Sequence, residues 1–350
     1  MSSQNKLLDE LVSLQIFSEV RKSGAERMLY SAIQVKPSLA KRILLAGFGS
    51  EHPFAEELVN HGVVFKSMEG SARELLPLIN FAKFLRTNKP DVVHIHIEQA
   101  FILLICISRI FAPKSRIIRT VHGNHRQYGI LGLRRRVLVK LAIRFFRVKW
   151  IACSSYISDI ETQASGCEIQ YIENWASIEK PDMEKVQEIN KQIEKNFGSK
   201  PRLLLVGNCD SNKNHIEILS DSKMLDNFCI IHIGSPLRAE SEELRLLSDF
   251  RIFSLDVDSS IGYELCDFVV VPSVKEAMSV VVLESLVRGK KVLVTREWGA
   301  WWSSNFESKP SELIYNYWVL ERQKNLRQLR DRFSPMRGIK QYAQVYAAWK

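Results

Sequence analysis

Two glutamates separated by seven residues have positions in this sequence that suggest a ligand-binding or catalytic role. Glu276 follows an apolar segment that ends at a Pro-Ser pair, and Glu284 lies inside the next apolar run. Three valines share a helix face with Glu284, because they lie three or four positions away: Val280, Val281 and Val287. An unpaired buried carboxylate is unfavourable, so Glu284 needs a partner. The partner could be a hydroxyl-rich ligand, or a buried Arg or Lys, in which case Glu276 would be an ordinary solvated loop residue.

The segments around these glutamates predict where they lie in a fold. Phe268-Val-Val-Val271 is an uninterrupted run with the pattern of a strand buried on both faces of a parallel sheet. A helix is predicted over 279–287, with Gly289 as its C-terminal stop. Both glutamates therefore follow the carboxyl end of a strand, which is the edge where open α/β sheets bind ligands.

Two further positions point to the same kind of edge. His122 directly follows a predicted strand at 116–121 and precedes a glycine, which lets a ligand approach closely. Gly24 follows the first predicted strand, 11–17, so nearby backbone N–H groups could face a phosphate. Zinc is an alternative explanation for four of the histidines, although such groups in a covered sheet are more often hydrogen-bonded internally. These four are His94, His96, His122 and His125.

The rest of the chain alternates strand and helix patterns twice. The first series runs to residue 172, a polar connection follows at 177–200, and a second series starts with the strand 202–206. This order predicts α/β architecture, with two tandem Rossmann-like, doubly wound parallel sheets. We expect domains at 1–176 and 177–333, and a closing helix in 334–350 that returns to the first domain.

Composition limits the class of protein. A chain of 350 residues favours two domains, and the net charge of +10 favours an anionic partner. No signal peptide is apparent at 1–19, and the longest apolar run, 100–112, is too short to span a bilayer. The six cysteines show no C-x-x-C spacing, which favours buried thiols in a reducing cytoplasm over disulfides or zinc.

Taken together, the motifs resemble those of GT-B glycosyltransferases of the large retaining family 4. The matching segments, in family order, are SGAER (23–27), PDVVHIH (90–96), RTVHG (119–123), IACSSYISD (151–159), IEN (172–174), LLLVGNCDSNKNH (203–215) and CDFVVVPSVKEAMSVVVLESLVRGKKVLVT (266–295). They cover nearly the whole chain. The last is the most specific, because a strand, Pro-Ser, two glutamates at this spacing, a helix and G-K-x-V occur together.

The resemblance implies metal-independent sugar transfer from a nucleotide-sugar to a hydroxyl acceptor, with retention and with no cofactor. By the family pattern Glu276 contacts the donor sugar, Glu284 the ribose, and Lys213 the diphosphate, while His122 lies near the reacting sugar. The expected catalytic residues are Glu276, His122 and Lys213. The expected donor-binding residues are Glu284, Lys213, Gly24, Asn208, Ser279 and Val280.

Several positions depart from the family pattern. Asn208 stands where the family usually has Arg, Glu276-Ala-Met-Ser279 replaces E-G-F-G, and Asn174-Trp175 replaces N-G. The segment 297–316 is shortened and rich in aromatic residues. These departures leave open a non-catalytic GT-B subunit that binds a nucleotide-sugar or a partner enzyme. A sugar-nucleotide epimerase of the same fold is a further alternative. A nucleic-acid-binding protein would explain the charge, but its motifs are missing from the sequence.

A basic stretch predicts a membrane contact. Residues 131–150 carry seven Arg and Lys and no acidic residue, interleaved with apolar residues at helical spacing. We expect the apolar stripe to pack on the sheet and the basic face, including Arg134–Arg136, to meet anionic lipid. The acceptor is then expected to be lipid-linked or an oligosaccharide of a bacterial cell-surface polysaccharide or glycolipid. The expected location is cytoplasmic, peripheral to the inner face of the plasma membrane.

Overall fold

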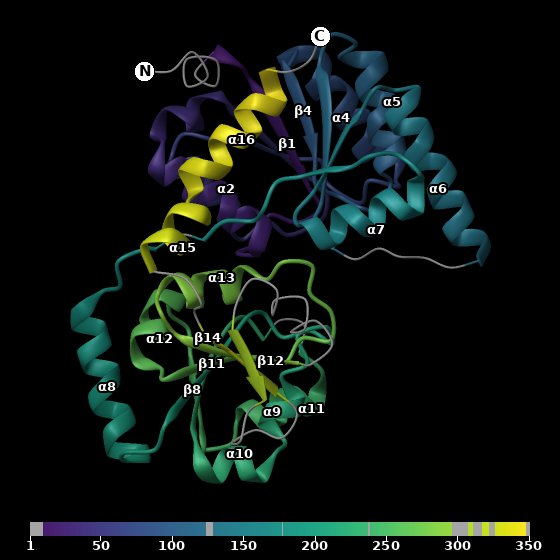
Figure 1. Cartoon of the computed structure of the whole chain (residues 1–350). Helices are drawn as coiled ribbons and strands as arrows, with labels where there is room; N and C mark the ends of the chain where they lie inside the picture. Colours follow the sequence, from purple (N-terminus) through teal and green to yellow (C-terminus); the bar gives the residue numbers. More distant parts are fainter. Residues whose placement is uncertain are drawn as a thin grey trace. The chain divides into compact units, whose positions relative to one another are not determined.

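The computed structural model describes residues 10–123, 129–176, 178–236, 239–295, 307–310, 317–321 and 326–347 (Figure 1). The chain forms two compact units. Unit 1 contains residues 1–175 and 334–350, and unit 2 contains residues 176–333. The C-terminal segment thus belongs to the same unit as the N-terminal half. The aromatic-rich segment 297–316 lies largely outside the described residues.

Unit 1 is built on a seven-stranded sheet of order β3-β2-β1-β4-β5-β6-β7, in which each neighbouring pair is parallel. The strands are β1 (Ser13–Phe17), β2 (Ile43–Gly47), β3 (Val64–Ser67), β4 (Val92–Ile95), β5 (Arg116–Val121), β6 (Lys149–Ala152) and β7 (Gln170–Tyr171). Strands β1, β2 and β4 are buried along their whole length, as expected for strands covered on both faces. Their carboxyl ends share one edge.

The connecting segments of unit 1 are helical. They are α2 (Gly24–Val35), the 3-10 helix η1 (Pro37–Arg42), α3 (Ala55–Asn60), α4 (Leu75–Asn88), α5 (Phe101–Phe111), α6 (Gly129–Arg144), α7 (Ser155–Ser165) and the C-terminal α16 (Pro335–Ala347). Helix α16 lies beside α2 (Figure 1). The approach is close at Gly338, where a Cβ atom would lie 2.2 Å from the Trp175 ring. Trp175 in turn donates from Nε1 to the Met28 carbonyl at 3.1 Å, which links α16 to α2.

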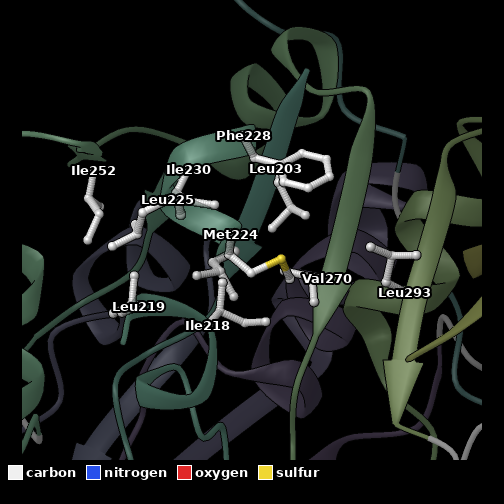
Figure 2. Packing of buried hydrophobic residues seen from close by; sticks show 11 residues of the cluster. Leu203, Ile218, Leu219, Met224, Leu225, Phe228, Ile230, Ile252, Val270 and Leu293 are labelled. Atoms are coloured by element: carbon white, nitrogen blue, oxygen red, sulfur yellow. The ribbon is translucent and has the colours of Figure 1, made fainter. Parts of the chain in front are cut away.

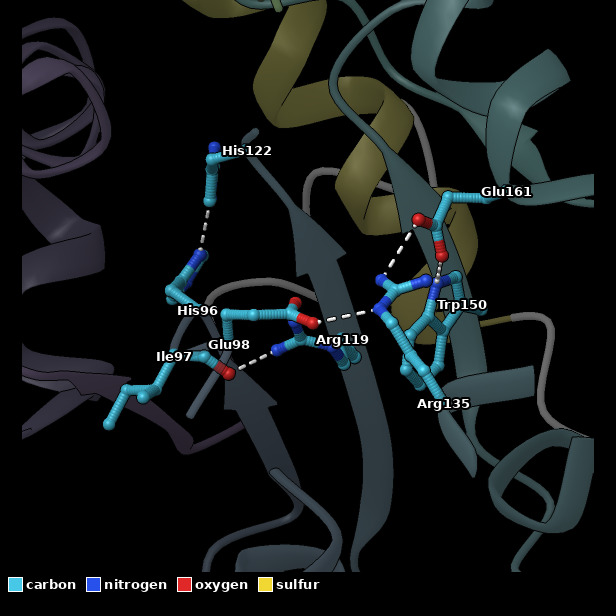
Figure 3. Close-up of polar contacts among 8 residues, drawn as sticks. All are labelled: His96, Ile97, Glu98, Arg119, His122, Arg135, Trp150 and Glu161. Carbon is cyan, nitrogen blue, oxygen red and sulfur yellow. Dashed lines mark hydrogen bonds and ion pairs between the residues drawn. The ribbon is translucent and has the colours of Figure 1, made fainter. Parts of the chain in front are cut away.

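Helix α6 corrects one expectation from the sequence. Its apolar stripe was expected to face the sheet, but Val137, Leu141 and Phe145 are exposed. Arg135 is buried instead and is held by two carboxylates, with Nε 3.0 Å from Glu98 and Nη2 2.9 Å from Glu161 (Figure 3). A buried arginine with two acidic partners fixes which face of a helix points inward more strongly than a few exposed apolar residues do.

The same ion-pair network extends into the sheet. Glu98 also pairs with Arg119, whose guanidinium is buried and lies over the rings of Phe101 and Trp150 at 4.9 and 5.0 Å (Figure 3). Trp150 donates from Nε1 to Glu161 at 3.2 Å. Each buried charge therefore has an opposite charge beside it, which offsets its desolvation.

Unit 2 contains a second seven-stranded sheet, of order β10-β9-β8-β11-β12-β14-β13. Its strands are β8 (Arg202–Val206), β9 (Cys229–Ile233), β10 (Ile252–Leu255), β11 (Phe268–Val271), β12 (Lys291–Thr295), β13 (Glu307–Pro310) and β14 (Tyr317–Glu321). Strands β8 to β12 are parallel, whereas β13 and β14 are antiparallel to their neighbours. The expectation of a purely parallel second unit missed this edge, because the residues of β13, ESKP, have no strand-forming pattern.

The helices of unit 2 are α8 (Met183–Phe197), α9 (Ile216–Leu219), α10 (Ser222–Asn227), α11 (Ser241–Leu247), α12 (Ser259–Leu265), α13 (Val280–Val287) and α15 (Leu326–Arg332). Helices α9 and α10 are short and separate, because Asp221 caps α10 by accepting from Lys223 N at 2.9 Å. Side chains from α9 and α10, such as Ile218 and Met224, pack on Leu203 and Val270 of the sheet (Figure 2). This core supports the carboxyl ends of β8 and β11.

Candidate active site

The loop after β8 places Lys213 at the carboxyl edge of the sheet in unit 2. Asp210 shapes this loop, because its Oδ1 accepts from the backbone N–H of both Asn212 and Lys213 at 2.9 Å. The loop begins at Gly207, whose φ of +142° lies in a region that side chains rarely adopt. The Lys213 side chain lies 3.7 Å from where a Cβ of Gly207 would be. Glycine here leaves the space that the lysine occupies.

A second loop, after β11, holds Glu276 against this lysine. Lys213 Nζ donates to Glu276 Oε1 at 2.8 Å, and the two side chains are 26% and 12% exposed. Backbone contacts join the loops on either side of the pair. Val274 N donates to the Asn212 carbonyl at 2.8 Å, and Asn212 Nδ2 donates to the Lys275 carbonyl at 3.1 Å. Glu276 is therefore a partly buried, ion-paired residue, and the interpretation of it as a solvated loop residue is wrong.

Glu284 lies on the buried face of α13, as its apolar neighbours predicted, and is 2% exposed. Its Oε2 accepts from the hydroxyl of Tyr263, in α12, at 2.9 Å. The guanidinium of Arg288 lies over the Tyr263 ring at 4.7 Å. A tyrosine hydroxyl thus contributes to the solvation of the buried carboxylate. This partner could not be predicted from the sequence, because Tyr263 lies in a helix of seven residues with no motif.

The amino end of α13 presents donors next to these side chains. Ser279 is its N-cap residue and makes no side-chain capping bond. Its Oγ is buried and has no hydrogen-bond partner among the residues that the structure describes. The first N–H groups of a helix, here near Val280, lack partners within the helix and carry partial positive charge. This end of α13 can therefore bind an anionic group.

Asn208 has a structural contact in the same loop region. Its Oδ1 accepts from the backbone N–H of Ser235 at 3.1 Å. The carboxyl ends of β8 and β9 meet closely here, since a Cβ on Gly234 would lie 1.9 Å from the Gly207 carbonyl oxygen. Asn208 thus joins the loops after β8 and β9. An arginine in its place would lose this bond.

In unit 1, His122 is the end of a hydrogen-bonded chain. It directly follows β5, and its Nε2 lies 2.8 Å from Nδ1 of His96, which follows β4 (Figure 3). His96 Nε2 lies 3.0 Å from Oε1 of Gln15 in β1. Three adjacent strands, β1, β4 and β5, therefore each carry one residue of this series of hydrogen bonds, within the strand or directly after it. Neighbouring His94 bonds Tyr346 of α16 at 2.9 Å and Thr120 at 2.8 Å.

The protonation of His122 follows from its partners. Burial lowers the pKa of His96 well below its usual value, with further lowering from His94, His122 and Arg119. Neutral His96 donates from Nε2 to Gln15, which leaves its Nδ1 to accept from His122. His122 therefore carries a proton on Nε2, and in the neutral form of its ring Nδ1 is the acceptor atom. A histidine oriented in this way can accept a hydrogen bond from a hydroxyl group.

Gly24 is the first residue of α2. The next residue, Ala25, lines a cavity of about 100 Å³ in unit 1 together with Gln15, Phe17 and His122. Unit 1 thus brings the start of α2 and His122 to one cavity, while unit 2 brings Lys213 and Glu276 into direct contact. Four histidines were considered as an alternative zinc site. Three of them, His94, His96 and His122, make the hydrogen bonds described above, and His125 lies outside the described residues.

Part of the chain matches a family of known proteins, and the whole chain matches solved structures. Residues 23–178 match the model of Glycosyltransferase Family 4. No curated protein sequence matches the chain. A solved structure of HepE from Anabaena in complex with UDP-glucose matches with a TM-score of 0.68 and 16% identity, covering 97% of this chain and 95% of that one. The chain has the GT-B fold, and its residues 23–178 match a glycosyltransferase family.

Two further solved structures match this chain over its length. A glycosyltransferase from Rickettsia africae has a TM-score of 0.65 and 17% identity, covering 96% of this chain and 93% of that one. WaaG, described as involved in lipopolysaccharide biosynthesis, has a TM-score of 0.55 and 14% identity, covering 97% and 96%. At these identities the likeness shows the fold. The predicted architecture of two Rossmann-like units in a GT-B protein is confirmed.

Proposed function

We propose that this glycosyltransferase moves a sugar from a nucleotide-sugar donor to a hydroxyl acceptor, with retention, and with no metal ion at the reacting sugar. The observation that carries the proposal is the position of Lys213, a cation held by two loops at the carboxyl edge of a parallel sheet and paired with Glu276 at 2.8 Å. The HepE structure was obtained with UDP-glucose, which supports a nucleotide-sugar as the donor.

Departure of the nucleoside diphosphate is the step in which developing negative charge must be stabilised. Negative charge grows on the leaving diphosphate as the sugar ring becomes oxocarbenium-like, and a fixed cation lowers the energy of that state. Lys213 supplies the charge, and the unpaired N–H groups at the start of α13 supply hydrogen bonds. These groups take the place that a divalent cation fills in metal-dependent transferases. The anomeric configuration of the product, read by NMR, tests retention.

The two carboxylates bind different parts of the nucleotide-sugar donor in this proposal. Glu276 accepts hydrogen bonds from hydroxyls of the transferring sugar, and its bond to Lys213 orients it. Glu284 accepts from ribose hydroxyls, and Tyr263 keeps the carboxylate in place through its bond at 2.9 Å. His122 accepts from a hydroxyl near the reacting carbon through Nδ1. Gly24 and its neighbours at the start of α2 add backbone donors.

Binding of the donor tests this assignment directly. A panel of nucleoside diphosphate sugars should include at least one compound that raises the melting temperature of the wild-type protein, because a ligand of the folded state stabilises it by mass action. The same compound should give a much smaller shift with Glu284→Ala. EDTA added during an activity assay should leave the rate unchanged. If no donor raises the melting temperature, the alternative of a subunit that supports a partner enzyme is favoured.

We further propose that the acceptor is lipid-linked or an oligosaccharide of a cell-surface polysaccharide or glycolipid, and that α6 binds the anionic inner face of the plasma membrane. Among the described residues, no helix has the length and apolar character needed to cross a bilayer. Helix α6 and the turn after it instead expose large apolar side chains, led by Ile130 at 85% and Phe145 at 73%. Basic residues are exposed beside them: Arg134, Arg136, Lys140, Arg144 and Arg147.

This combination fits the interfacial region of a membrane. Apolar side chains can enter the acyl boundary while each nearby Lys or Arg contributes about 1 kcal/mol on an anionic surface. The protein should therefore sediment with phosphatidylglycerol liposomes at low salt and be released by 1 M salt, where screening shortens to roughly 3 Å. Charge reversal at Arg134 and Arg136 should abolish the binding, whereas reversal at Lys185 and Lys191 of α8 should not. Wild-type protein that stays in the supernatant would contradict the proposal.

Arg135 must be left unchanged in that experiment. All three residues from 134 to 136 were expected to face lipid, but Arg135 is buried between Glu98 and Glu161. A third acidic group there would disrupt the fold and lower binding for an unrelated reason.

A further inference from the structure

A second group of chemically reactive side chains lies inside unit 2, beneath the Lys213 loop. Cys209 lies in that loop, His215 directly precedes α9, and His232 lies in β9. One donor atom from each of the three lies within 4.8 Å of the other two, and all three residues are buried. Cys209 Sγ is 3.6 Å from His232 Nε2 and 3.8 Å from His215 Nδ1. Soft and borderline donors therefore converge on one point.

A carboxylate lies against this group. Glu243, in α11, is 2% exposed, and its Oε1 is 3.2 Å from His215 Nδ1. That contact does not have the geometry of a hydrogen bond, and Glu243 Oε1 has no hydrogen-bond partner among the residues that the structure describes. A buried carboxylate oxygen without a bond is unfavourable, so its position here needs an explanation. A cation between these side chains supplies one.

Three of the six separations between the four donor atoms are close to those of a tetrahedral zinc site. With Zn–S near 2.3 Å and Zn–N or Zn–O near 2.0–2.1 Å, neighbouring ligands lie about 3.3–3.6 Å apart. The three separations here are 3.2, 3.6 and 3.8 Å. By contrast, a thiol 3.6–3.8 Å from two imidazole nitrogens makes only weak hydrogen bonds.

We propose that Cys209, His215, His232 and Glu243 bind one zinc ion with a structural role. One thiolate, two imidazoles and one carboxylate form a donor set that zinc takes readily, and four protein ligands leave no open position for catalysis. The outer contacts are also those of a metal site. His232 Nδ1 lies 3.2 Å from Ser254 Oγ, which orients the ring so that Nε2 faces the other donors.

The zinc ion would fix the loop that carries the proposed diphosphate-binding lysine. Cys209 and His215 lie on either side of Lys213 in the sequence, so one ion would anchor both ends of this short segment. This consequence rests on the proposed function, whereas the metal site itself does not. The sequence favoured buried thiols over zinc because the ligands are 6, 17 and 11 residues apart, with none of the short spacings that mark zinc motifs.

Metal analysis of the purified full-length protein tests the site. Wild-type protein produced with added zinc and then dialysed against metal-free buffer should retain about one zinc per chain by mass spectrometry. The zinc content of Cys209→Ser should be at least ten-fold lower than that of the wild type. Cys229→Ser, which changes another buried free cysteine of unit 2, should keep it. Cobalt substitution of the wild type should give a thiolate-to-metal charge-transfer band that Cys209→Ser lacks.

Outcomes separate this inference from the proposed function. Wild-type protein that holds less than about a tenth of an equivalent of zinc, and shows no thiolate band with cobalt, would overturn the metal site even if the protein consumes a nucleotide-sugar. Zinc at one equivalent in a protein that neither binds nor consumes any nucleotide-sugar would uphold the site and refute the donor assignment. Because the wild-type measurements suffice, a folding defect in Cys209→Ser would not obscure the answer.

Discussion

Lys213 donates a hydrogen bond to Glu276 at 2.8 Å, across two loops that follow different strands of unit 2. The pair links the two groups that the proposed function assigns to the diphosphate and to the transferring sugar. Each residue therefore orients the other in the protein without a donor. A diphosphate that binds would also form an ion pair with Lys213. The Lys213–Glu276 pair therefore orients both side chains and does not block donor binding.

Replacement of Lys213 by Ala should lower kcat/KM for sugar transfer on the order of 100-fold or more. The reason is that Asn208 stands where a second cation is usual, and its Oδ1 already accepts from Ser235. Lys275→Ala is the matched control, because that side chain is exposed in the neighbouring loop and should change kcat/KM less than about two-fold. Nearly unchanged activity in Lys213→Ala would mean that the phosphate is held elsewhere.

Alanine at the two glutamates should have different kinetic effects. Glu284→Ala should weaken nucleotide binding by roughly 1.5–3 kcal/mol, and Glu276→Ala should lower kcat with less effect on nucleotide affinity. Tyr263→Phe, which removes the hydroxyl that bonds Glu284, should weaken nucleotide binding by a smaller amount in the same direction. Calorimetric titration with the nucleoside diphosphate and steady-state kinetics measure both quantities. Wild-type values for both alanine variants would refute the assignment.

The sequence predicted the parts of this fold that depend on local pattern. Apolar runs such as Phe268–Val271 gave strands, and the buried position of Glu284 followed from its helical neighbours. It could not predict pairings between distant segments. Tyr263 with Glu284 and Gln15 with His96 are 21 and 81 residues apart, and neither belongs to a motif. The orientation of α6 was missed for the same reason, because Glu98 and Glu161 decide it from other elements.

Removal of Arg135 should destabilise unit 1 strongly. Arg135→Ala leaves Glu161, which is 1% exposed, without its ion-pair partner, and the loss of one member of a buried pair costs about 3–5 kcal/mol. Arg136→Ala, on the exposed side of the same helix, should change the free energy of unfolding by less than about 0.5 kcal/mol. Urea denaturation of both variants measures the difference. Equal stabilities would show that the network in Figure 3 contributes little.

Titration of Glu26 should make the free energy of unfolding depend on pH. Burial raises the pKa of this carboxyl from 4.5 to about 7, against smaller opposing effects of hydrogen bonds from Ser23 and the backbone. The raised folded-state pKa means that the folded state binds the proton more tightly than the unfolded state. Its contribution is therefore complete below pH 4.5 and is lost as the pH rises to 7, by about 3 kcal/mol in total.

Glu26→Gln should remove this dependence, because the amide stays neutral. The variant should gain stability relative to wild type as the pH rises from 5 to 8, as measured by urea denaturation at each pH. Glu56→Gln, an exposed position of α3, should track the wild type throughout. A difference between Glu26→Gln and wild type that stays constant with pH would show that the carboxyl is ionised in the folded protein over this whole range.

The central claim is that this chain consumes a nucleotide-sugar at Lys213, Glu276 and Glu284. Release of nucleoside diphosphate tests it most directly, with purified wild type and Lys213→Ala incubated in parallel with a panel of nucleotide-sugars and a bacterial lipid extract as acceptor. We expect the wild type to release nucleoside diphosphate from at least one donor, at a rate on the order of 100-fold above that of Lys213→Ala. No release from any donor, or equal release by both proteins, would contradict it.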